Sequence, residues 1–220
     1  MAAGKGKMKA TDFNLKKEVA YLPEQGLVVH EDRRLLLMDA NAMGLLMDSM
    51  IKNMGFDKAM EVFMQSGFEH GYSDFLAMEA KYGEKFANEI ELFASGPVIH
   101  SWEGLVQAKP ISIEADRATG KFFSEGIWTN SWQAQQYLTF NSVGEKAVCY
   151  SLTGYASGWT SAFLGKPVLA VETACVAKGD AHCSWLLKPA EEFGKEASME
   201  LNFLKDQFEK LLLNKANEGV

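Results

Sequence analysis

The sequence predicts an α+β protein in which an N-terminal helical portion precedes an antiparallel sheet-and-helix domain. Two observations predict this class: apolar residues recur with helical spacing up to about residue 95, and alternation with period two becomes common after Pro97. The chain has 220 residues, of which 47% are hydrophobic. That is enough to form a hydrophobic core of ordinary size.

The N-terminal portion shows three helical patterns. An amphipathic stripe with helical spacing is formed by Met43, Leu46, Met47, Met50 and Met54. We interpret these methionines as packing residues, and Asp39 or Asn41 is placed to cap the start of the helix. Two further patterns run through 57–80 and 83–95, and the Ser-Gly-Pro run at 95–97 is expected to end the last of them.

The segment after Pro97 is strand-rich. Residues 111–114 alternate with period two, and residues 121–128 follow a turn at Thr119-Gly120. The expected strands are 98–102, 104–106, 111–114, 121–128, 168–171 and 182–187, with a helix at 147–165 and a loop at 178–180. The strands up to residue 128 predict an antiparallel meander, which is followed by the helix and then by the last two strands.

The helix expected at 147–165 has nineteen residues without a formal charge, which is long enough to cross a bilayer. Eight of them are Gly, Ser or Thr, so the segment is far less hydrophobic than a leucine-rich span. Small residues of this kind let a helix pack closely against protein. We therefore expect a buried core helix and no membrane contact.

The C-terminal part, residues 190–220, is predicted to be an amphipathic linker helix. Leu201, Leu204, Phe208 and Leu211 have heptad spacing, with charged and polar residues between them. Two heptads are too few for a free coiled coil, so this stripe must pack either on its own domain or on a second copy of the chain. We expect the second arrangement, a homodimer, because an exposed apolar stripe usually marks a contact surface.

The composition excludes some classes of partner and compartment. The 22 Lys and Arg residues against 29 Asp and Glu residues give a net charge of −7, which lacks the basic footprint of a nucleic-acid-binding domain. The three cysteines are an odd number, and the opening residues MAAGKGKMKATDFNLKK lack the apolar core of a secretory signal. These features predict a protein of the reducing cytoplasm.

The three cysteines and one glutamate have spacing that suggests a metal site. Glu172 precedes Cys175 by three residues, Cys183 follows after a predicted turn, and Cys149 lies near the start of the uncharged helix. Three thiolates and a carboxylate suit a structural zinc ion with four protein ligands. The spacing leaves a second interpretation open, in which the cysteines are small buried apolar residues.

A longer motif surrounds these cysteines. The stretch 172–183 contains Glu172, Cys175, Ala177, Gly179, Asp180 and Cys183. It resembles the E-x-x-C-x-A-x-G-D-x-x-C signature of the four-vinyl-reductase-type small-molecule-binding domain, with every position present. Stretches 96–106, 154–156 and 161–163, together with Trp128, resemble the sensor domain of XylR/DmpR-type aromatic-responsive transcriptional activators. The likeness covers about residues 12–195.

The resemblance implies a function and a set of site residues. It implies a cytoplasmic sensor that binds phenol or a related monocyclic aromatic, and ATPase and DNA-binding domains in a longer chain. By matching positions, the zinc ligands are Cys149, Glu172, Cys175 and Cys183, and the contacts to the phenol hydroxyl are His100 and Trp128. Phe93 matches a pocket position, and Tyr155 and Trp159 lie four residues apart on one helix face, where they would flank a flat ligand.

Two other functions remain open from the sequence. The same small-molecule-binding domain occurs beside tetrapyrrole reduction, but four protein ligands leave a zinc ion no open position for catalysis, so we expect no enzyme activity. A haem gas sensor would need a Tyr-x-Ser-x-Arg clamp, and Trp159 occupies the arginine position here.

The patterns along the chain predict three parts. We expect a helical and dimerisation portion at 1–95, a ligand- and zinc-binding domain at 96–189 and a linker helix at 190–220.

Overall fold

The structure is a computed structural model that describes residues 7–30, 33–197, 200–204, 207 and 208. Its helices are α1 (Leu15–Glu18), α2 (Ala40–Met54), α3 (Phe56–Tyr82), α4 (Glu89–Trp102), α5 (Trp132–Phe140) and α6 (Tyr150–Leu164). Its strands are β1 (Val19–Leu22), β2 (Leu27–His30), β3 (Arg33–Leu35), β4 (Gln107–Asp116), β5 (Lys121–Thr129), β6 (Val168–Ala174) and β7 (Cys183–Pro189). The predicted α+β class is confirmed.

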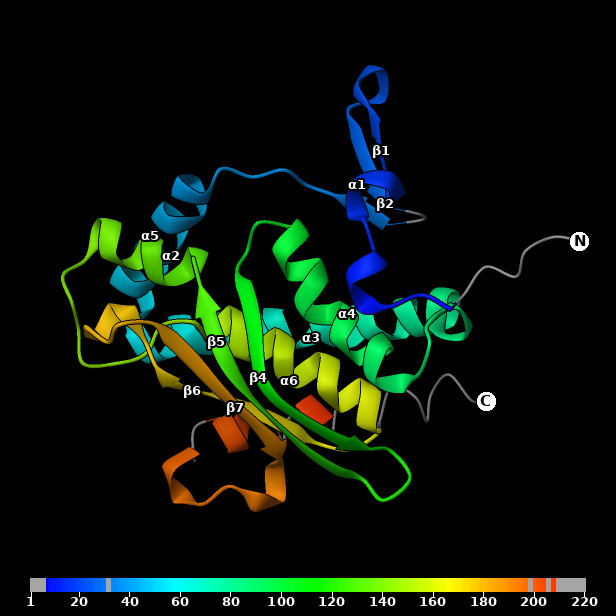
Figure 1. The fold of residues 1–220 in the computed structure, drawn as a ribbon. Helices are drawn as coiled ribbons and strands as arrows, with labels where there is room; N and C mark the ends of the chain where they lie inside the picture. The colour runs from blue at the N-terminus through cyan, green and yellow to red at the C-terminus, as the bar shows by residue number, and fades with distance from the viewer. Residues whose placement is uncertain (1–6, 31–32, 198–199, 205–206, 209–220) are drawn as a thin grey trace, which may run out of the picture.

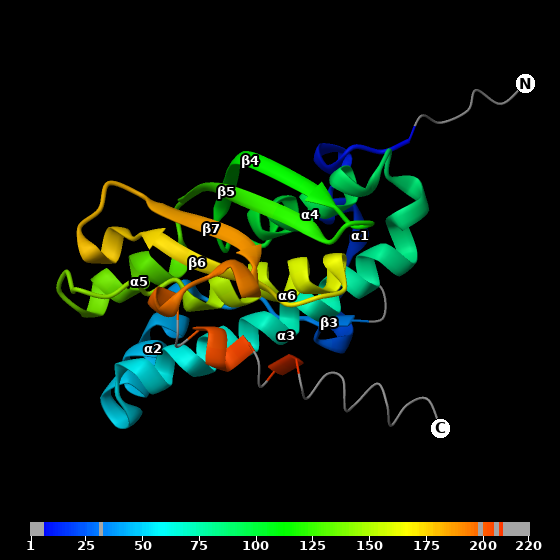
Figure 2. The ribbon, with the colours of Figure 1, turned by 90° about the horizontal axis from the view of Figure 1, so that it is seen from below.

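A four-stranded antiparallel sheet forms one layer of the fold, with the strand order β4-β5-β7-β6. Helix α6 lies against one face of this sheet, and α3 lies on the far side of α6 (Figure 2). Helix α4 lies beside α6 and contacts β4 (Figure 1). Because side chains alternate along a strand, every second residue of β7 is buried against the helices. The core therefore lies between the sheet and α6.

The uncharged helix expected at 147–165 is α6, and it is buried as predicted. A Cβ atom on Gly154 or Gly158 would overlap the backbone carbonyl groups of Met64 and Phe68 on α3. Glycine is therefore required where the two helices come close together. Gly165, with φ of 72°, ends α6 in the left-handed conformation. None of the described helices combines the length and apolarity needed to span a membrane.

Helix α4 corrects the expected helix end at 95–97 and the expected strands at 98–102 and 104–106. The helix continues through Pro97 to Trp102, and strand begins only at Gln107. Proline leaves the carbonyl four residues earlier without its usual donor. Here that carbonyl belongs to Phe93, and it accepts a hydrogen bond of 3.0 Å from the indole N–H of Trp159. A contact between helices thus replaces the missing bond, and the expected division at 95/96 falls inside α4.

The helix expected from residue 83 begins only at Glu89, after a short 3-10 turn at Gly83–Lys85, and the other predicted elements match the structure closely. Asp39 caps α2, since its carboxylate accepts from the backbone N–H groups of Asn41 and Ala42. The 57–80 pattern is α3, and the turn at Thr119-Gly120 joins β4 to β5, with Gly120 at φ of 69°. The sequence patterns did not indicate α5 or the strands β1, β2 and β3.

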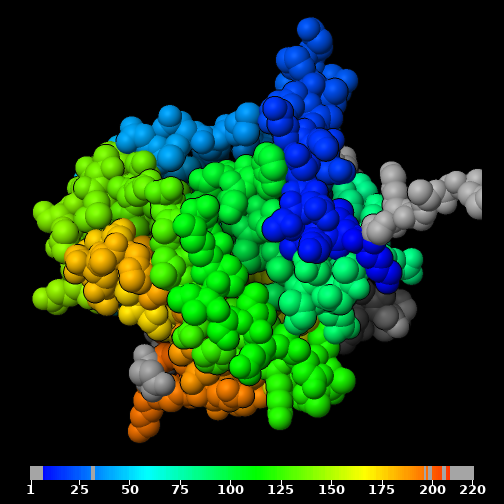
Figure 3. Space-filling view, viewed as in Figure 1, coloured from blue at the N-terminus to red at the C-terminus, as the bar shows by residue number. Residues whose placement is uncertain are grey.

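Strands β1, β2 and β3 form a second sheet, which we call the arm. It stands away from the body of the molecule (Figures 1 and 3). No residue of these three strands is fully buried. Strand β2 is half-buried along its length, and Val19 of β1 packs against the main core. A sheet of this size is marginally stable in water by itself, so the arm depends on contacts beyond its own strands.

The C-terminal stripe packs on its own domain, which corrects the expectation that it is free to form a dimer seam. Leu204 is 1% exposed and lies with Phe203 in a cluster that includes Met64 and Phe68 of α3. Leu201 and Phe208 are half-buried against the same cluster. Leu211 lies outside the described residues.

Candidate functional site

A cavity of about 50 Å³ lies between α4, α6 and the sheet. A water molecule needs roughly 10–15 Å³ of such space, so the cavity has room for a few water molecules, and an aromatic ring would need its walls to move outward. The residues predicted to bind a ligand, His100, Trp128, Phe93, Tyr155 and Trp159, all lie on its wall. The structure thus brings together five side chains from three elements.

His100 carries the most unusual polar group of the cavity. It lies on α4, is 5% exposed, and its Nε2 atom has no hydrogen-bond partner among the residues that the structure describes. Burial lowers the pKa of His100 to about 3, and the charge of His70 contributes in the same direction. The imidazole is therefore neutral at physiological pH, and one ring nitrogen accepts a hydrogen bond while the other donates.

Aromatic rings form most of the remaining wall. Trp128 on β5 is 4% exposed, and its ring centroid lies 5.1 Å from that of Trp185 on β7. The rings of Tyr155 and Trp159 stack with an interplanar angle of 16°, and the His100 ring lies 3.8 Å from Tyr155. These rings provide flat apolar faces for a flat apolar ligand.

A polar network begins behind Tyr155 and leads to the arm. The Tyr155 hydroxyl donates to Oδ2 of Asp74 on α3 at 3.1 Å, and Asp74 also pairs with Arg33 of β3. His70 Nε2 lies 3.3 Å from the same carboxylate. Glu103 lines a second cavity, which lies beside this network and is separate from the ligand cavity. Burial raises the pKa of Glu103 to about 8, and the charge of Asp74 adds to the effect. The pocket and the arm are thus joined by a chain of direct contacts.

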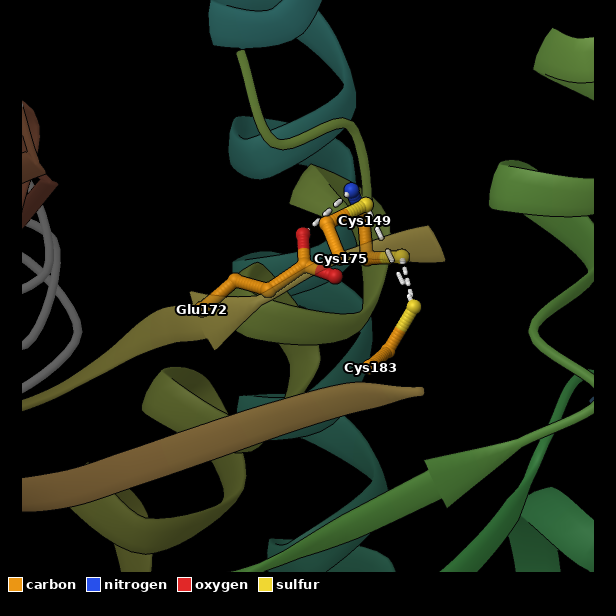
Figure 4. Close-up of side chains that lie close together, drawn as sticks. All are labelled: Cys149, Glu172, Cys175 and Cys183. Atoms are coloured by element: carbon orange, nitrogen blue, oxygen red, sulfur yellow. Dashed lines mark hydrogen bonds between the residues drawn. The ribbon is translucent and has the colours of Figure 1, made fainter. Parts of the chain in front are cut away.

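The four predicted metal ligands come together in the structure (Figure 4). Cys149 precedes α6, Glu172 lies in β6, Cys175 follows β6 and Cys183 begins β7. One ligand atom from each lies within 4.8 Å of the others. The sulfur of Cys183 is 3.8 Å from that of Cys149 and 4.0 Å from that of Cys175. This cluster could hold a metal ion.

The loop of the signature motif fixes this geometry. Asp180 accepts from the backbone N–H of Cys175 at 2.8 Å, and Gly179 has φ of 90°, a conformation that favours glycine. Glu172 accepts from the backbone N–H of Cys149 with one carboxylate oxygen at 2.9 Å. Its other oxygen, Oε1, is buried and has no hydrogen-bond partner in the described part of the chain. A ligand atom is therefore free to bind an ion.

The sulfur atoms have very different acidities. Hydrogen bonds from the thiols of Cys149 and Cys183 lower the pKa of Cys175, while burial raises the pKa of Cys149. Burial also raises the pKa of Glu172 to about 8. Without a cation, the cluster thus favours one thiolate that accepts from neighbouring thiols. A bound cation would favour release of the remaining protons.

Several site residues were missed from the sequence. Trp185 and Leu152 line the cavity, and so do the hydroxyl residues Ser124 and Thr160. Trp185 had a usable signal, because it lies two residues after Cys183 on a strand and so shares its buried face. Asp74 had none, since a single acidic residue in a long helix is normally a surface group.

Comparisons with known proteins agree with this architecture. Residues 14–116 match the family described as activator of aromatic catabolism, and residues 139–189 match the four-vinyl-reductase-type domain. The phenol regulator MopR of Acinetobacter guillouiae is 28% identical over 180 residues, which are 82% of this chain and 32% of MopR. The transcriptional regulatory protein XylR of Pseudomonas putida is 28% identical over 203 residues, which are 92% of this chain and 36% of XylR.

A solved structure is also similar. The phenol-responsive sensory domain of the transcription activator PoxR, crystallised with phenol, has a TM-score of 0.80 and 27% identity to this chain. The match covers 87% of this chain and 94% of the PoxR domain, whereas the chain spans about a third of the length of MopR and XylR. The chain is therefore homologous to MopR and XylR and similar in structure to the sensory domain of PoxR, with one segment that matches each of the two family models.

Proposed function

We propose that this chain is the effector-binding domain of a transcriptional activator, and that it binds phenol or a related monocyclic aromatic. The ligand occupies the cavity between α4, α6 and the sheet. The observation that carries the proposal is the buried Nε2 atom of His100, which lacks a partner in a cavity lined with aromatic rings. An unpaired buried polar atom is costly, so the cavity favours a ligand that pairs with it.

His100 and Trp128 are proposed to bind the hydroxyl group of the ligand. The neutral imidazole accepts or donates a hydrogen bond, and the indole N–H of Trp128 donates one, so together they match a hydroxyl that does both. The ring of the ligand then packs against Tyr155, Trp159 and Phe93. Toluene would fill the same apolar space but leave the polar atoms unpaired, which costs about 1–3 kcal/mol per group.

We propose that the metal is zinc and that its role is structural. Four zinc-bound sulfur atoms at about 2.3 Å in a regular tetrahedron are separated by roughly 3.8 Å. The observed sulfur distances of 3.8 and 4.0 Å fit this value, and Oε1 of Glu172 offers the fourth ligand. Zinc would join the start of α6 to strands β6 and β7. Trp128 lies on β5, the strand that pairs with β7.

This function does not require catalysis. Four protein ligands leave zinc no open position for a substrate or an activated water. Tyr155 and Trp159, which occupy the positions of a haem clamp, are already bonded to Asp74 and to the Phe93 carbonyl. Reduced thiols as zinc ligands favour a cytoplasmic location. In a longer chain, the phenol-bound state of this domain would act on ATPase and DNA-binding domains.

We further propose a homodimer that uses the arm and α2 rather than the C-terminal stripe. Exposed apolar side chains occur along this part of the chain: Tyr21 in β1, Leu36, Leu37 and Met38 between β3 and α2, and Leu45 and Leu46 in α2 are between 49 and 75% exposed. Symmetric association would cover this surface and support the arm, whose strands have no buried residue.

Calorimetry with phenol and toluene tests the proposed function directly. We expect phenol to bind with 1:1 stoichiometry per chain and toluene to bind about tenfold or more weakly, because toluene leaves His100 unpaired. Equal affinity for the two compounds would contradict hydroxyl recognition. Absence of phenol binding would contradict the proposed function altogether.

A further inference from the structure

A second polar atom in the cavity has no partner. Thr160 on α6 is 1% exposed, and its hydroxyl oxygen forms no hydrogen bond with any part of the chain that the structure describes. A threonine in a helix commonly bonds the carbonyl four residues earlier, but this hydroxyl does not. Thr160 and His100 line the same cavity, so the cavity wall offers two unpaired buried polar side chains.

His100 and Trp128 lie toward the N-terminal end of α6. Trp128 pairs across the sheet with Cys183, whose sulfur lies 3.8 Å from that of Cys149, the residue immediately before α6. The ring of His100 lies 3.8 Å from that of Tyr155. The two groups proposed to bind the ligand hydroxyl therefore belong to one end of the cavity.

Thr160 lies toward the other end, and Ser124 lies there with it. The Ser157 hydroxyl accepts from the backbone N–H of Ala170 at 2.8 Å. Ala170 pairs with Leu187, which in turn pairs with Ser124 on β5. Ser124 is thus level with the second half of α6, where Thr160 lies, and it is 3% exposed.

The two unpaired side chains lie at different places on the cavity wall. His100 lies beside Tyr155, and the Cα atom of Thr160 is about 7.5 Å further along the axis of α6 than that of Tyr155. A ring with two polar substituents could therefore pair with both. We propose that Thr160 forms a second hydrogen-bonding subsite, which selects monocyclic phenols with a polar substituent opposite the hydroxyl held by His100. This inference rests on the proposed function.

The chemistry of the subsite determines which substituents it accepts. A threonine hydroxyl donates one hydrogen bond and accepts others, so it suits a second hydroxyl or an amino group. A methyl group of similar size would leave the buried Thr160 oxygen unpaired. The subsite therefore distinguishes hydroquinone from 4-methylphenol, which have nearly the same shape.

Calorimetry under nitrogen with phenol, hydroquinone and 4-methylphenol tests the subsite. We expect the wild-type protein to bind hydroquinone more tightly than 4-methylphenol. Thr160→Val, which keeps the shape and removes the hydroxyl, should weaken hydroquinone binding about tenfold and leave the Kd values of phenol and 4-methylphenol within about twofold of wild type. Thr160→Ser restores a hydroxyl and should keep the preference.

A matched control lies on the same helix. Thr153 is also buried, but its hydroxyl donates to the carbonyl of Tyr150, and it does not line the cavity. Thr153→Val should therefore leave the preference unchanged. Two results would overturn the subsite: Thr160→Val weakens hydroquinone and 4-methylphenol equally, or Thr153→Val weakens hydroquinone as much as Thr160→Val does. In either case, binding of phenol to the wild-type protein would still support the proposed function. Failure of phenol to bind the wild-type protein would overturn both.

Discussion

Tyr155 and Asp74 connect the candidate pocket to the interior of the helical layer. The tyrosine hydroxyl donates to Oδ2 of Asp74 at 3.1 Å, while the tyrosine ring lies on the pocket wall. Asp74 also pairs with Arg33 of the arm, so one carboxylate contacts both α6 and β3. Tyr155, whose ring would contact a ligand, is thus connected to the arm through two contacts, first with Asp74 and then from Asp74 to Arg33.

The first prediction concerns the hydrogen bond of Tyr155. Tyr155→Phe keeps the ring but removes a donor to a buried carboxylate, so it should lower the free energy of unfolding by about 1–3 kcal/mol. Phenol affinity should change little, because the ring still lines the pocket. Urea denaturation and calorimetry measure the two effects. Tyr21→Phe, at a 60% exposed position, is the control and should change neither. A Tyr155→Phe protein of wild-type stability would show that the bond contributes nothing.

The second prediction concerns the metal. We expect one zinc per chain, and Cys175→Ser or Cys183→Ser should lose the metal and much of the stability, because binding energy at a structural site is folding energy. Ser184→Ala changes an exposed hydroxyl beside Cys183 and should retain zinc. Elemental analysis and thermal denaturation report both quantities. Well-folded wild-type protein without zinc would contradict the assignment.

The third prediction concerns pH. Burial raises the pKa of Glu103 from 4.5 in the unfolded chain to about 8, so between these values only the folded state holds the proton. The contribution of Glu103 to stability is therefore greatest below pH 4.5 and is lost as the pH rises toward 8. Glu103→Gln should raise the Tm at about pH 8 and leave it nearly unchanged at about pH 5. A Tm difference that does not depend on pH would contradict this account.

Ligand binding should respond to pH differently. Since burial lowers the pKa of His100 to about 3, its imidazole stays neutral from about pH 5 to about pH 8. Phenol affinity should be constant across this range when it is measured by calorimetry. A loss of affinity centred near about pH 6.5, the ordinary value for histidine, would show that His100 is accessible to protons and not buried as described.

The fourth prediction separates the C-terminal stripe from the proposed dimer surface. Leu204→Ala should cost about 2–5 kcal/mol of stability and leave the oligomeric state unchanged, because Leu204 is packed within its own domain. Leu36→Glu with Leu37→Glu should instead weaken the dimer, since both side chains are at least 70% exposed. Light scattering at micromolar concentration checks this. A wild-type monomer would remove the dimer proposal.

Much of the body of the fold could be predicted from the sequence. The uncharged helix with its small residues is α6, and the turn at Thr119-Gly120 joins β4 to β5. The metal cluster was also predictable, because a turn within the motif returns Cys183 to Cys175. These features depend on residue spacing within one element and on short loops, and both can be recognised in the sequence.

The errors arose where distant residues change a local preference. A proline normally ends a helix, but the indole of Trp159 stabilises Pro97 inside α4 by donating a hydrogen bond to the Phe93 carbonyl. The pairing of Asp74 with Arg33 and Tyr155 joins residues that are 41 and 81 positions apart. Spacing within a single sequence carries no signal for such contacts.

The central claim is that His100 recognises the hydroxyl of a phenolic ligand, and paired calorimetry with phenol and benzene tests it most directly. For His100→Ala, we predict that phenol binding weakens by about 1–3 kcal/mol while benzene binding is unchanged or improved. Trp128→Phe should act in the same direction, because it removes an N–H donor and keeps a ring. Equal weakening of phenol and benzene by His100→Ala would contradict the claim and indicate general disruption of the pocket.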